Sequence, residues 1–472
     1  MSIVITILLE NIKTTHIDIF IQNNKQMKKI SILGAGLSAT SLIEYLLKRA
    51  EKFDWQINVG DYDKKIAESK IGDNKRANAF TFDVNNNEQV NQVVSESDIV
   101  VSMLPARFHH IIAQSCVDNK KQMLTASYVS PQLKALNQEA KDAGVGIYME
   151  LGVDPGIDHM SAMKIIDKLR KDGSSLDAFF SSTGGLVAPE YDNNPWNYKF
   201  TWNPRNVVLA GQGTSMFIRN GRYKYIPYQR LFYRLSETSI AGVGDFEIYP
   251  NRDSLKYRET YGLETIPTIF RGTMRRKGYS RAWNVFIQLG ATDDSYTIED
   301  SENMTFRQFI NTFLAYEEHT PLEKKIRSHF SVLIDDDVYE KLKWLDIFED
   351  IKIPLKNATP AQILQYILER KWQLDENDKD MIAMQHRFEF TTKEGKKRKI
   401  VSSLVVMGES KEKTAMAITV GTPLAIATKM VANNELNFKG LQVPVIPEIY
   451  NPILDELEEL NIKFIEEESD LD

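Results

Sequence analysis

Gly34, Gly36 and Ala39 form a G-x-G-x-x-A pattern between a short apolar run and a stretch with helical spacing. Gly34 fits a tight turn, Gly36 lets the backbone approach a diphosphate, and the small Ala39 lets a helix pack closely on a strand. The helix that follows would direct its first N–H groups at negative charge. Together with Leu37 and Ser38, these residues predict a loop that holds a pyrophosphate.

An acidic residue follows the second strand, where dinucleotide sites with such a loop bind the ribose. A second apolar strand ends at Asp61, 22 residues after Ala39. A carboxylate at that place accepts hydrogen bonds from both ribose hydroxyls of a dinucleotide, whereas a 2′-phosphate would meet like charge. No arginine follows in Tyr62-Asp63. The pattern therefore predicts a dinucleotide site that favours NAD, with NADP left open.

The elements that must position these residues alternate between strand and helix. Strands are predicted at 28–33, 55–59, 79–84, 98–104 and 146–150, with helical stretches such as 132–143 between them. This alternation predicts a parallel, doubly wound α/β sheet. Ligands of such sheets lie at the carboxyl ends of the strands. The segments expected there are Asp83, Leu104-Pro105, Ser127-Tyr128 and residues 152–158.

Composition limits the remaining functions. The chain has 472 residues, a net charge of −7 and one cysteine, Cys116. This length suggests about two to four folded units. The acidic balance argues against nonspecific binding to nucleic acid, and no apolar run reaches the ~18–20 residues of a membrane span. A lone cysteine excludes an internal disulfide and fits a reducing cytoplasm.

Both ends of the chain are expected to lie outside the main domains. Residues 1–26 precede the first strand and are interpreted as an extension. The apolar run at 3–9 lacks the basic flank and the cleavage site of a secretory signal. The final residues, 466–472, are expected to be a solvated acidic tail.

The pattern of residue types along the sequence changes near residue 155. β-like segments predominate over 178–289, and helices are expected over about 300–385. Strands return at 387–391 and 399–407, around a charged hairpin at 393–399. Helices at 423–432 and 453–460 close the chain. A second domain therefore follows the first, with a helical part inside it.

Nine motifs occur in one order along the chain. They are GAGLSA at 34–39, TASYVSP at 125–131, ELGVDPGIDH at 150–159, TGGLVAPE at 183–190, NPWNYKF at 194–200, YPNRDS at 249–254, RGT at 271–273, KDMIAMQHRF at 379–388 and TVGTPLAIATK at 419–429. Together they closely resemble the glutamate-forming saccharopine dehydrogenases (saccharopine reductases) of lysine metabolism. The resemblance runs from about residue 28 to 460.

The resemblance implies an α/β fold with two main domains. These are a Rossmann NAD(P)-binding domain at 27–154 and a mixed-sheet α/β domain at 155–418, of the substrate and dimerisation type, with its helical insertion at about 300–385. A C-terminal segment at 419–472 would return to the Rossmann domain and end in the acidic tail. The expected partner is a small amino-acid substrate, not nucleic acid or a membrane, and a homodimer is compatible with the family.

The resemblance also implies which residues bind. Gly36 to Ala39 would hold the pyrophosphate. The cofactor cleft would be lined by Asp83-Val84, Leu104-Pro105 and Thr125-Ala126, although Asp83-Val84 could equally be an ordinary strand exit. The substrate contacts would be Ser127, Tyr128, Asp154, Arg252 and Arg271-Gly272-Thr273. Where the family often has a basic residue and a threonine suited to NADP, this chain has Asp61-Tyr62-Asp63, which puts NADP use in doubt.

Saccharopine, the substrate of that family, sets chemical demands. It is lysine and glutamate sharing one nitrogen, with three carboxylates, two amines and a net charge of about −1 near neutrality. Forked cations suit such a ligand, and the candidates are Arg252 and Arg271, with Arg205 third. The implied reaction moves hydride from the carbon beside the secondary amine to NAD(P)+, and water splits the imine into 2-aminoadipate 6-semialdehyde and glutamate. Asp154 and Tyr128 are the acid–base candidates, and NAD would favour this oxidative direction, that of lysine degradation.

Other interpretations stay open. One is a related NAD(P)-dependent oxidoreductase acting on another secondary amine, such as a carboxylated polyamine, and another is a non-catalytic NAD(H)-binding sensor. Asp154-Pro155-Gly156 could be only a tight turn. His109-His110 do not share a helix face and lack a third ligand, so no metal site is expected. His159 and His386 are expected to be structural hydrogen-bonding residues.

Overall fold

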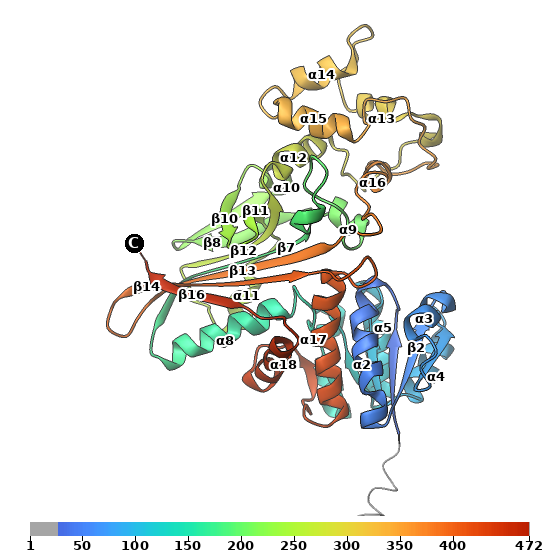
Figure 1. The fold of residues 1–472 in the computed structure, drawn as a ribbon, viewed down its shortest axis with the longest axis vertical. Helices are drawn as coiled ribbons and strands as arrows, with labels where there is room; N and C mark the ends of the chain where they lie inside the picture. Colours follow the sequence, from blue (N-terminus) through green and yellow to red (C-terminus); the bar gives the residue numbers. More distant parts are fainter. Residues whose placement is uncertain (1–26, 472) are drawn as a thin grey trace, which may run out of the picture.

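Two β-sheets, with helices packed between them, organise the chain (Figure 1). The structure is a computed structural model that describes residues 27–471, so the expectation for residues 1–26 lies outside the described part. The glycine loop, Gly34 to Ala39, directly follows a strand of the first sheet, and Arg271 lies on a strand of the second sheet. The residues predicted to bind ligands therefore come from both sheets.

The first sheet is parallel throughout, with the strand order β15-β6-β5-β4-β1-β2-β3. Its strands are β1 (Lys28–Leu33), β2 (Trp55–Asp61), β3 (Ala77–Thr81), β4 (Ile99–Ser102), β5 (Gln122–Leu124), β6 (Gly146–Tyr148) and β15 (Gly440–Gln442). The connecting helices are α2 (Thr40–Phe53), α3 (Lys64–Ile71), α4 (Asn87–Ser95), α5 (His109–Asp118), α6 (Pro131–Ala135) and α7 (Asn137–Ala143). All four residues of the central strand β4 are buried, because helices cover both faces of the sheet. The expected Rossmann fold is confirmed.

The second sheet is mixed, because β12 pairs with β7 in parallel while its other pairs are antiparallel. The order is β10-β11-β12-β7-β13-β14-β16, with β8 and β9 attached beside β12. The strands are β7 (Ser175–Val187), β8 (Thr214–Arg219), β9 (Arg222–Pro227), β10 (Ser236–Ile240), β11 (Gly244–Pro250), β12 (Thr268–Arg276), β13 (Asp380–Thr391), β14 (Lys397–Met407) and β16 (Ile465–Asp470). The short helices α9 (Pro204–Val208), α10 (Tyr228–Leu231) and α11 (Lys256–Tyr261) lie in its connections. The predicted mixed-sheet α/β fold is confirmed.

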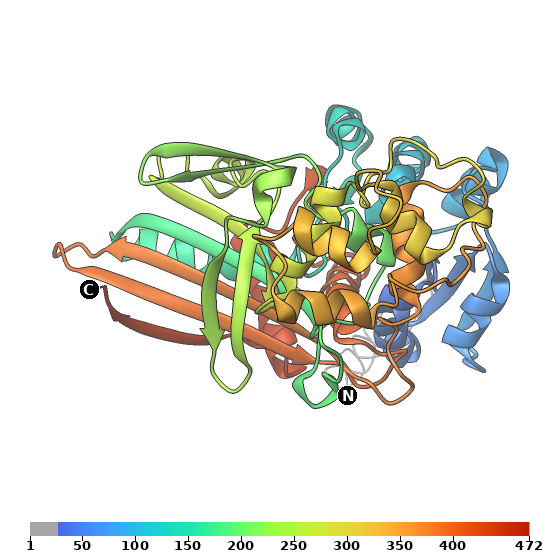
Figure 2. The ribbon, with the colours of Figure 1, turned by 90° about the horizontal axis from the view of Figure 1, so that it is seen from above.

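A helical segment stands on the outer side of the second sheet. It contains α12 (Tyr279–Leu289), α13 (Phe306–Thr312), α14 (Leu322–His329), α15 (Asp336–Trp344) and α16 (Pro360–Glu369). Figure 2 shows these helices over one end of the sheet, while the far ends of β13 and β14 extend away from them. Thr305 and Thr359 begin α13 and α16 with complete capping boxes, which fixes where each helix starts.

Three helices fill the space between the two sheets: α8 (Ile157–Lys171), α17 (Ala415–Ala432) and α18 (Pro447–Glu459) (Figure 1). α17 approaches α2 closely, since a Cβ on Gly421 would lie 2.7 Å from the backbone nitrogen of Leu42. Within residues 27–471, α17 is the one helix long and apolar enough to cross a membrane, but 78% of that stretch is buried inside the protein. It serves here as a core helix that joins the two sheets.

The acidic end of the chain is exposed, as expected of a solvated terminus, but it is not an unpaired tail. Its residues form β16, which pairs antiparallel with β14 in the second sheet. The basic hairpin explains the pairing, because Arg398 Nη1 of β14 lies 2.9 Å from Glu468 Oε1. The C-terminal segment thus contributes β15 to the first sheet and β16 to the second. The domain limits at 154/155 and 418/419 stay a prediction.

Several predicted helices were wrong in extent. The stretch at 132–143 is two helices, interrupted at Leu136, and Asn137 at the break accepts a hydrogen bond from the backbone of Leu441. α17 begins at Ala415, eight residues before the predicted start, because Thr414 caps it and Pro423 is accommodated inside the helix. Periodicity located these helices, but contacts distant in sequence set their limits.

Candidate active site

The glycine loop leaves an open surface at the carboxyl edge of the first sheet. Gly34 has φ of +100°, and a Cβ there would lie 2.8 Å from the carbonyl oxygen of Met103, so only glycine fits. A Cβ on Gly36 would meet nothing within 4 Å. Leu37 is 53% exposed. Ala39, the last residue of the turn Leu37–Ala39 that precedes α2, is buried. The residues present therefore fit a dinucleotide, whose diphosphate would approach Gly36.

Asp61 is held beside this loop by backbone hydrogen bonds. Its Oδ2 accepts from the N–H of Ala35 at 2.7 Å, and its Oδ1 accepts from the N–H of Asp63 at 3.1 Å. Each carboxylate oxygen keeps a further lone pair that a ribose hydroxyl could use. The predicted neighbours, the glycine loop and the acid that ends β2, are thus in contact.

The remaining residues predicted to line the cofactor cleft follow the strands of the same edge. Asp83 lies just after β3, and its Oδ1 accepts from both the N–H and the side-chain amide of Asn85. That pattern favours an ordinary turn for Asp83, whereas Val84 is buried beside it. Leu104 and Pro105 follow β4, and Thr125 and Ala126 follow β5.

A cluster of buried charges lies where the second sheet faces this edge. Arg271 of β12 is 4% exposed and donates through Nη2 to Asp154 and, at 2.9 Å, to Asp158 Oδ2. Its guanidinium also stacks 3.9 Å from the centre of the Tyr257 ring. Arg271 was predicted to bind a substrate carboxylate as a free fork, but both carboxylates it contacts belong to the protein. Its position makes it the partner that orients Asp154.

The two carboxylates of this cluster are shifted in opposite directions. Burial raises the pKa of Asp154, but the charge of Arg271 and the Tyr128 hydrogen bond outweigh it and hold that pKa below its usual value. Burial raises the pKa of Asp158, and the nearby charge of Asp154 raises it further. Asp154 is therefore the more acidic member of the pair and is ionised near neutral pH.

The two acid–base candidates lie in contact. The hydroxyl of Tyr128 donates to Asp154 Oδ1 at 2.8 Å. Desolvation of that hydroxyl and the charge of Asp154 raise the pKa of Tyr128 well above its usual value. The ring itself is 38% exposed, so Tyr128 has one face toward solvent and its polar end against the cluster. This arrangement places a neutral donor and an ionised acceptor at one point of the cleft.

A second layer of hydrogen bonds lies behind the cluster. It confirms the expectation that His159 is a structural hydrogen-bonding residue, although its partners were not predicted. His159 Nε2 lies 2.7 Å from Glu150 Oε2, and His159 Nδ1 lies 2.8 Å from the hydroxyl of Tyr261. Glu150 Oε1 accepts from the N–H of Val129, which fixes the segment that carries Tyr128. Burial lowers the pKa of His159, but Asp158 and Glu150 outweigh it and raise that pKa. The only sequence signal was an acid and a histidine flanking Asp-Pro-Gly in one motif.

Ser127 and the remaining substrate candidates are placed differently. Ser127 Oγ lies 2.7 Å from Nε2 of the buried His109. Gly272 is closely packed, because a Cβ there would lie 2.2 Å from Ile248, and Thr273 pairs with Tyr249 and Thr183 across the sheet.

The arginines differ in their surroundings. Arg252 is exposed, and its turn packs on Arg271, since Asn251 N–H donates to the Arg271 carbonyl at 2.8 Å. Arg205 forms an ion pair with Asp294, which lies between α12 and α13. Arg205 is therefore not part of the cluster. Arg252 is therefore an exposed cation on a turn whose backbone contacts Arg271.

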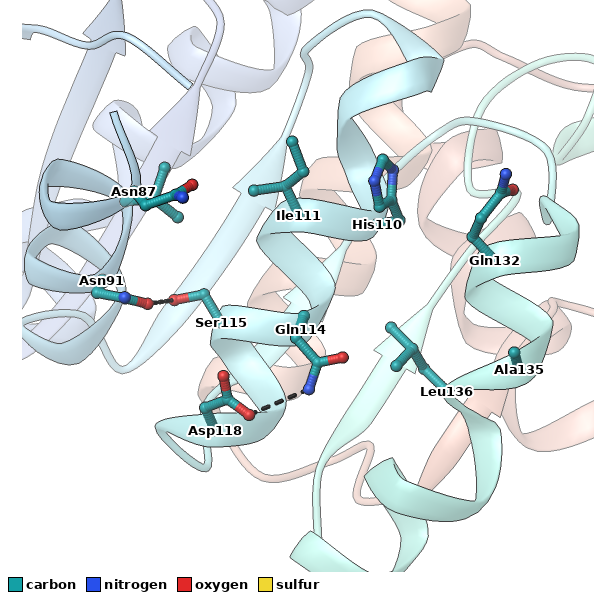
Figure 3. Close-up of a pocket in the computed structure, with 11 residues that line it drawn as sticks. Asn87, Asn91, His110, Ile111, Gln114, Ser115, Asp118, Gln132, Ala135 and Leu136 are labelled. Carbon is teal, nitrogen blue, oxygen red and sulfur yellow. Dashed lines mark hydrogen bonds between the residues drawn. The ribbon is translucent and has the colours of Figure 1, made fainter. Parts of the chain in front are cut away.

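A separate pocket of about 590 Å³ lies on the outer face of the first sheet (Figure 3). Its lining comes from α4, α5 and α6: Asn87, Val90, Asn91, His110, Ile111, Gln114, Ser115, Asp118, Gln132, Ala135 and Leu136. Part of this lining is already satisfied internally, because Ser115 donates to Asn91 and Gln114 to Asp118. None of the residues predicted to bind cofactor or substrate lines this pocket.

A dinucleotide loop on a parallel sheet, facing an ionised cluster from a second sheet, defines the class of two-domain NAD(P)-binding oxidoreductases. Residues 30–147 match the family model of the saccharopine dehydrogenase NADP binding domain, and residues 152–462 match that of the saccharopine dehydrogenase C-terminal domain. The chain belongs to the saccharopine dehydrogenase family, which confirms the resemblance.

Relatives support the same assignment. The saccharopine dehydrogenase [NADP(+), L-glutamate-forming] of Schizosaccharomyces pombe is 32% identical over 93% of this chain and 99% of its own length. The mitochondrial alpha-aminoadipic semialdehyde synthase of Mus musculus is 32% identical over 93% of this chain, which spans about half, 47%, of that protein.

The solved structure of apo saccharopine dehydrogenase (L-Glu forming) from Saccharomyces cerevisiae has a TM-score of 0.85 to this chain. Its sequence is 30% identical, and the match covers 94% of this chain and 100% of that one. The similarity confirms the α/β fold with its parallel and mixed sheets. The names of the family model and of the Schizosaccharomyces pombe relative refer to NADP, so they lend no support to the preference for NAD predicted from Asp61.

Proposed function

We propose that this protein is an L-glutamate-forming saccharopine dehydrogenase. It oxidises L-saccharopine with NAD(P)+ and water to 2-aminoadipate 6-semialdehyde, L-glutamate, NAD(P)H and a proton, or runs the reverse condensation. The observation that carries the proposal is the contact of Tyr128 with Asp154 and of Asp154 with Arg271, at the strand edge that also bears the glycine loop. The family and its L-glutamate-forming relatives support this substrate.

The charge distribution of the site suits an amino acid with several carboxylates. The charge of Arg271 is balanced by Asp154 and Asp158, so it orients the acid rather than attracting an anion by itself. Arg252 is exposed and, in the proposal, binds a saccharopine carboxylate with its fork. Ser127, Gly272 and Thr273 complete the proposed contacts.

The protein's own groups position the substrate and hold a proton. Bound NAD(P)+ supplies the hydride-accepting chemistry. The ionised Asp154 accepts a hydrogen bond from the secondary amine of the substrate and keeps that nitrogen in place. Tyr128 keeps its proton on the hydroxyl that faces Asp154 Oδ1 and is the acid of the pair, while the ionised Asp154 takes the proton that the substrate amine must lose before hydride leaves.

We further propose that NAD is the preferred cofactor. The carboxylate of Asp61 is fixed beside the loop, and a 2′-phosphate there would be repelled by its charge. The names of the yeast relatives specify NADP(+), so this proposal separates this chain from them. The homodimer and the cytoplasmic location stay predictions from sequence.

A product assay tests the function directly. The purified protein is incubated with L-saccharopine and either NAD+ or NADP+, and both reduced nicotinamide and glutamate are measured. We expect the two products in equal amounts, with faster turnover on NAD+. Turnover of a carboxylated polyamine but not of saccharopine would support the rival oxidoreductase, and tight NAD(H) binding without turnover of either would support the sensor.

A further inference from the structure

His109 lies outside the residues proposed above, yet both of its ring nitrogens are engaged at the carboxyl edge of the first sheet. It is the first residue of α5 and is 1% exposed. Nδ1 lies 2.8 Å from Ser102 Oγ at the end of β4, and Nε2 lies 2.7 Å from Ser127 Oγ in the segment after β5. The imidazole thus connects a fully buried serine with a serine of the proposed substrate site.

The direction of these hydrogen bonds follows from Ser102. Its side chain is 0% exposed, and within residues 27–471 its Oγ has one hydrogen-bond partner, His109 Nδ1. Buried donors in folded proteins are almost always satisfied, so the Ser102 hydroxyl donates to Nδ1. Burial, with His110 adding to it, lowers the pKa of His109 to about 4, so the ring is neutral near pH 7.

A neutral imidazole that accepts at Nδ1 carries its proton on Nε2. Nε2–H therefore donates to Ser127 Oγ, its nearest neighbour, while Thr125 Oγ1 lies further away at 3.4 Å. The N–H of Ser127 also reaches Thr125 Oγ1 at 3.4 Å, which ties its backbone to the same group. Ser127 thus accepts from the ring, and its own hydrogen is left free.

We propose that His109 is a positioning residue that makes Ser127 a hydrogen-bond donor to a carboxylate of the substrate. The free O–H of the half-buried Ser127 is available to the cleft beside Tyr128. A carboxylate only accepts hydrogen bonds, so it matches that O–H, whereas an ammonium only donates. Ser127 keeps a second lone pair, but its free O–H makes the chain Ser102–His109–Ser127 favour an acceptor such as a carboxylate at this point. The substrate part of this inference rests on the proposed function.

The tautomer is tested without any substrate. The protein is prepared with ¹⁵N-labelled histidine, and the ring signals of His109 are assigned as those that disappear in His109→Gln. We expect Nδ1 to resonate as an unprotonated nitrogen and Nε2 as a protonated one. A proton on Nδ1, or averaged signals from two exchanging tautomers, would overturn the inference. This result stands even if the protein fails to turn over saccharopine, which would remove only the proposed function.

Kinetics with Ser102→Ala tests the effect on the substrate. Loss of the donor to Nδ1 is expected to raise the KM for saccharopine about 5–10-fold, with kcat within about twofold and the NAD+ Kd unchanged. Ser97→Ala is the matched control, because Ser97 is a buried serine at the other end of β4 that bonds Ser31 Oγ and the Val93 carbonyl. Equal KM values for the two variants would contradict the inference.

Variants of His109 itself separate hydrogen bonding from packing. His109→Gln can still donate toward Ser127, so we expect a KM within about threefold of the wild type. His109→Phe keeps a ring but no donor, and its KM should rise at least as much as that of Ser102→Ala. If His109→Gln and His109→Phe raise KM equally, the ring acts by packing alone and the inference is wrong. Should either variant fail to fold, the tautomer and the Ser102→Ala comparison still decide.

Discussion

The glycine loop and the Arg271 cluster face the same edge of the first sheet, but they are built in opposite ways. The loop is formed within Gly34 to Ala39 and leaves Leu37 53% exposed, with open space over Gly36. The cluster joins Asp154 and Arg271, which are 117 residues apart, and Arg271 is 4% exposed. The loop thus has no counter-charge until a ligand binds, whereas in the cluster the charge of Arg271 is already paired with carboxylates of the protein.

This difference predicts how each region responds to substitution. In the loop, the backbone binds and the free protein depends little on any one side chain beyond Gly34. In the cluster, each charge compensates another inside the protein, so removing one leaves its partner buried and unpaired. Changes in the cluster should therefore affect stability and turnover, and changes near the loop should affect cofactor affinity alone.

The largest effect is expected for Arg271→Met. The substitution leaves Asp154 and Asp158 buried without their cation, which should lower the free energy of unfolding by about 3–5 kcal/mol. Equilibrium denaturation followed by fluorescence measures this change. A loss below about 1 kcal/mol would mean that the cluster is not compensated as described.

Arg275→Met provides the control for that prediction. Arg275 lies on the same strand, β12, and is equally buried, but its guanidinium lies among tyrosine rings, the nearest being Tyr198 at 5.0 Å. It has no carboxylate partner within ion-pair distance among residues 27–471, so its loss should cost only about 1–2 kcal/mol. Equal destabilisation by the two variants would show that burial, not charge pairing, sets the cost.

Tyr128→Phe should separate chemistry from stability in the cluster. It removes the hydroxyl that donates to Asp154 and keeps the ring, so kcat for saccharopine should fall about 100-fold. The free energy of unfolding should change by less than about 1.5 kcal/mol, and the NAD+ Kd should not change. Tyr316→Phe, at an 87% exposed tyrosine of the helical segment, is the control. A fall in kcat of less than about threefold would remove Tyr128 as an acid–base group.

Arg252→Ala tests the exposed cation on the turn that contacts Arg271. Loss of its fork should raise the KM for saccharopine about 10–150-fold, because a hydrogen bond to a charged group contributes about 1.5–3 kcal/mol. NAD+ binding, measured by calorimetry, should stay the same. If saccharopine and NAD+ affinities fell equally, the substitution would have damaged the turn at 249–254, and Arg252 would not be a substrate ligand.

The loop was predictable from sequence and the cluster was not, for a physical reason. Gly34, Gly36 and Asp61 belong to one strand–turn–helix–strand unit, whose spacing is set by local geometry. Asp154 and Tyr128 could be placed at strand ends of the first sheet. Their contact with each other and with Arg271 depends on how the second sheet packs against that edge. Local patterns do not contain that information.

Two polar groups show what sequence reasoning missed. His109 was considered only as a metal ligand, and its bonds join the start of α5 to the ends of β4 and β5, which meet at one edge. The acidic terminus was expected to be a tail, because its composition says nothing of the basic strand β14 with which it pairs. In both cases the deciding partner lies on another element of the fold.

The smallest effect, and the sharpest test of the loop, is expected for Asp61→Ser. Removing the carboxylate removes its repulsion of a 2′-phosphate and one acceptor for the ribose, so the ratio of NADP+ to NAD+ affinity should rise about tenfold, or about 1.4 kcal/mol. Asp63→Ser is the matched control, because Asp63 is two residues away but caps α3 by accepting from the N–H of Lys65. It should cost about 1 kcal/mol of stability and leave the cofactor ratio unchanged. Calorimetric titration with both cofactors measures the ratio, and a wild-type protein that binds NADP+ more tightly would show that Asp61 does not set the preference. Neither variant should alter the kcat of the cofactor-saturated enzyme, because the loop binds the cofactor while the cluster orients the substrate.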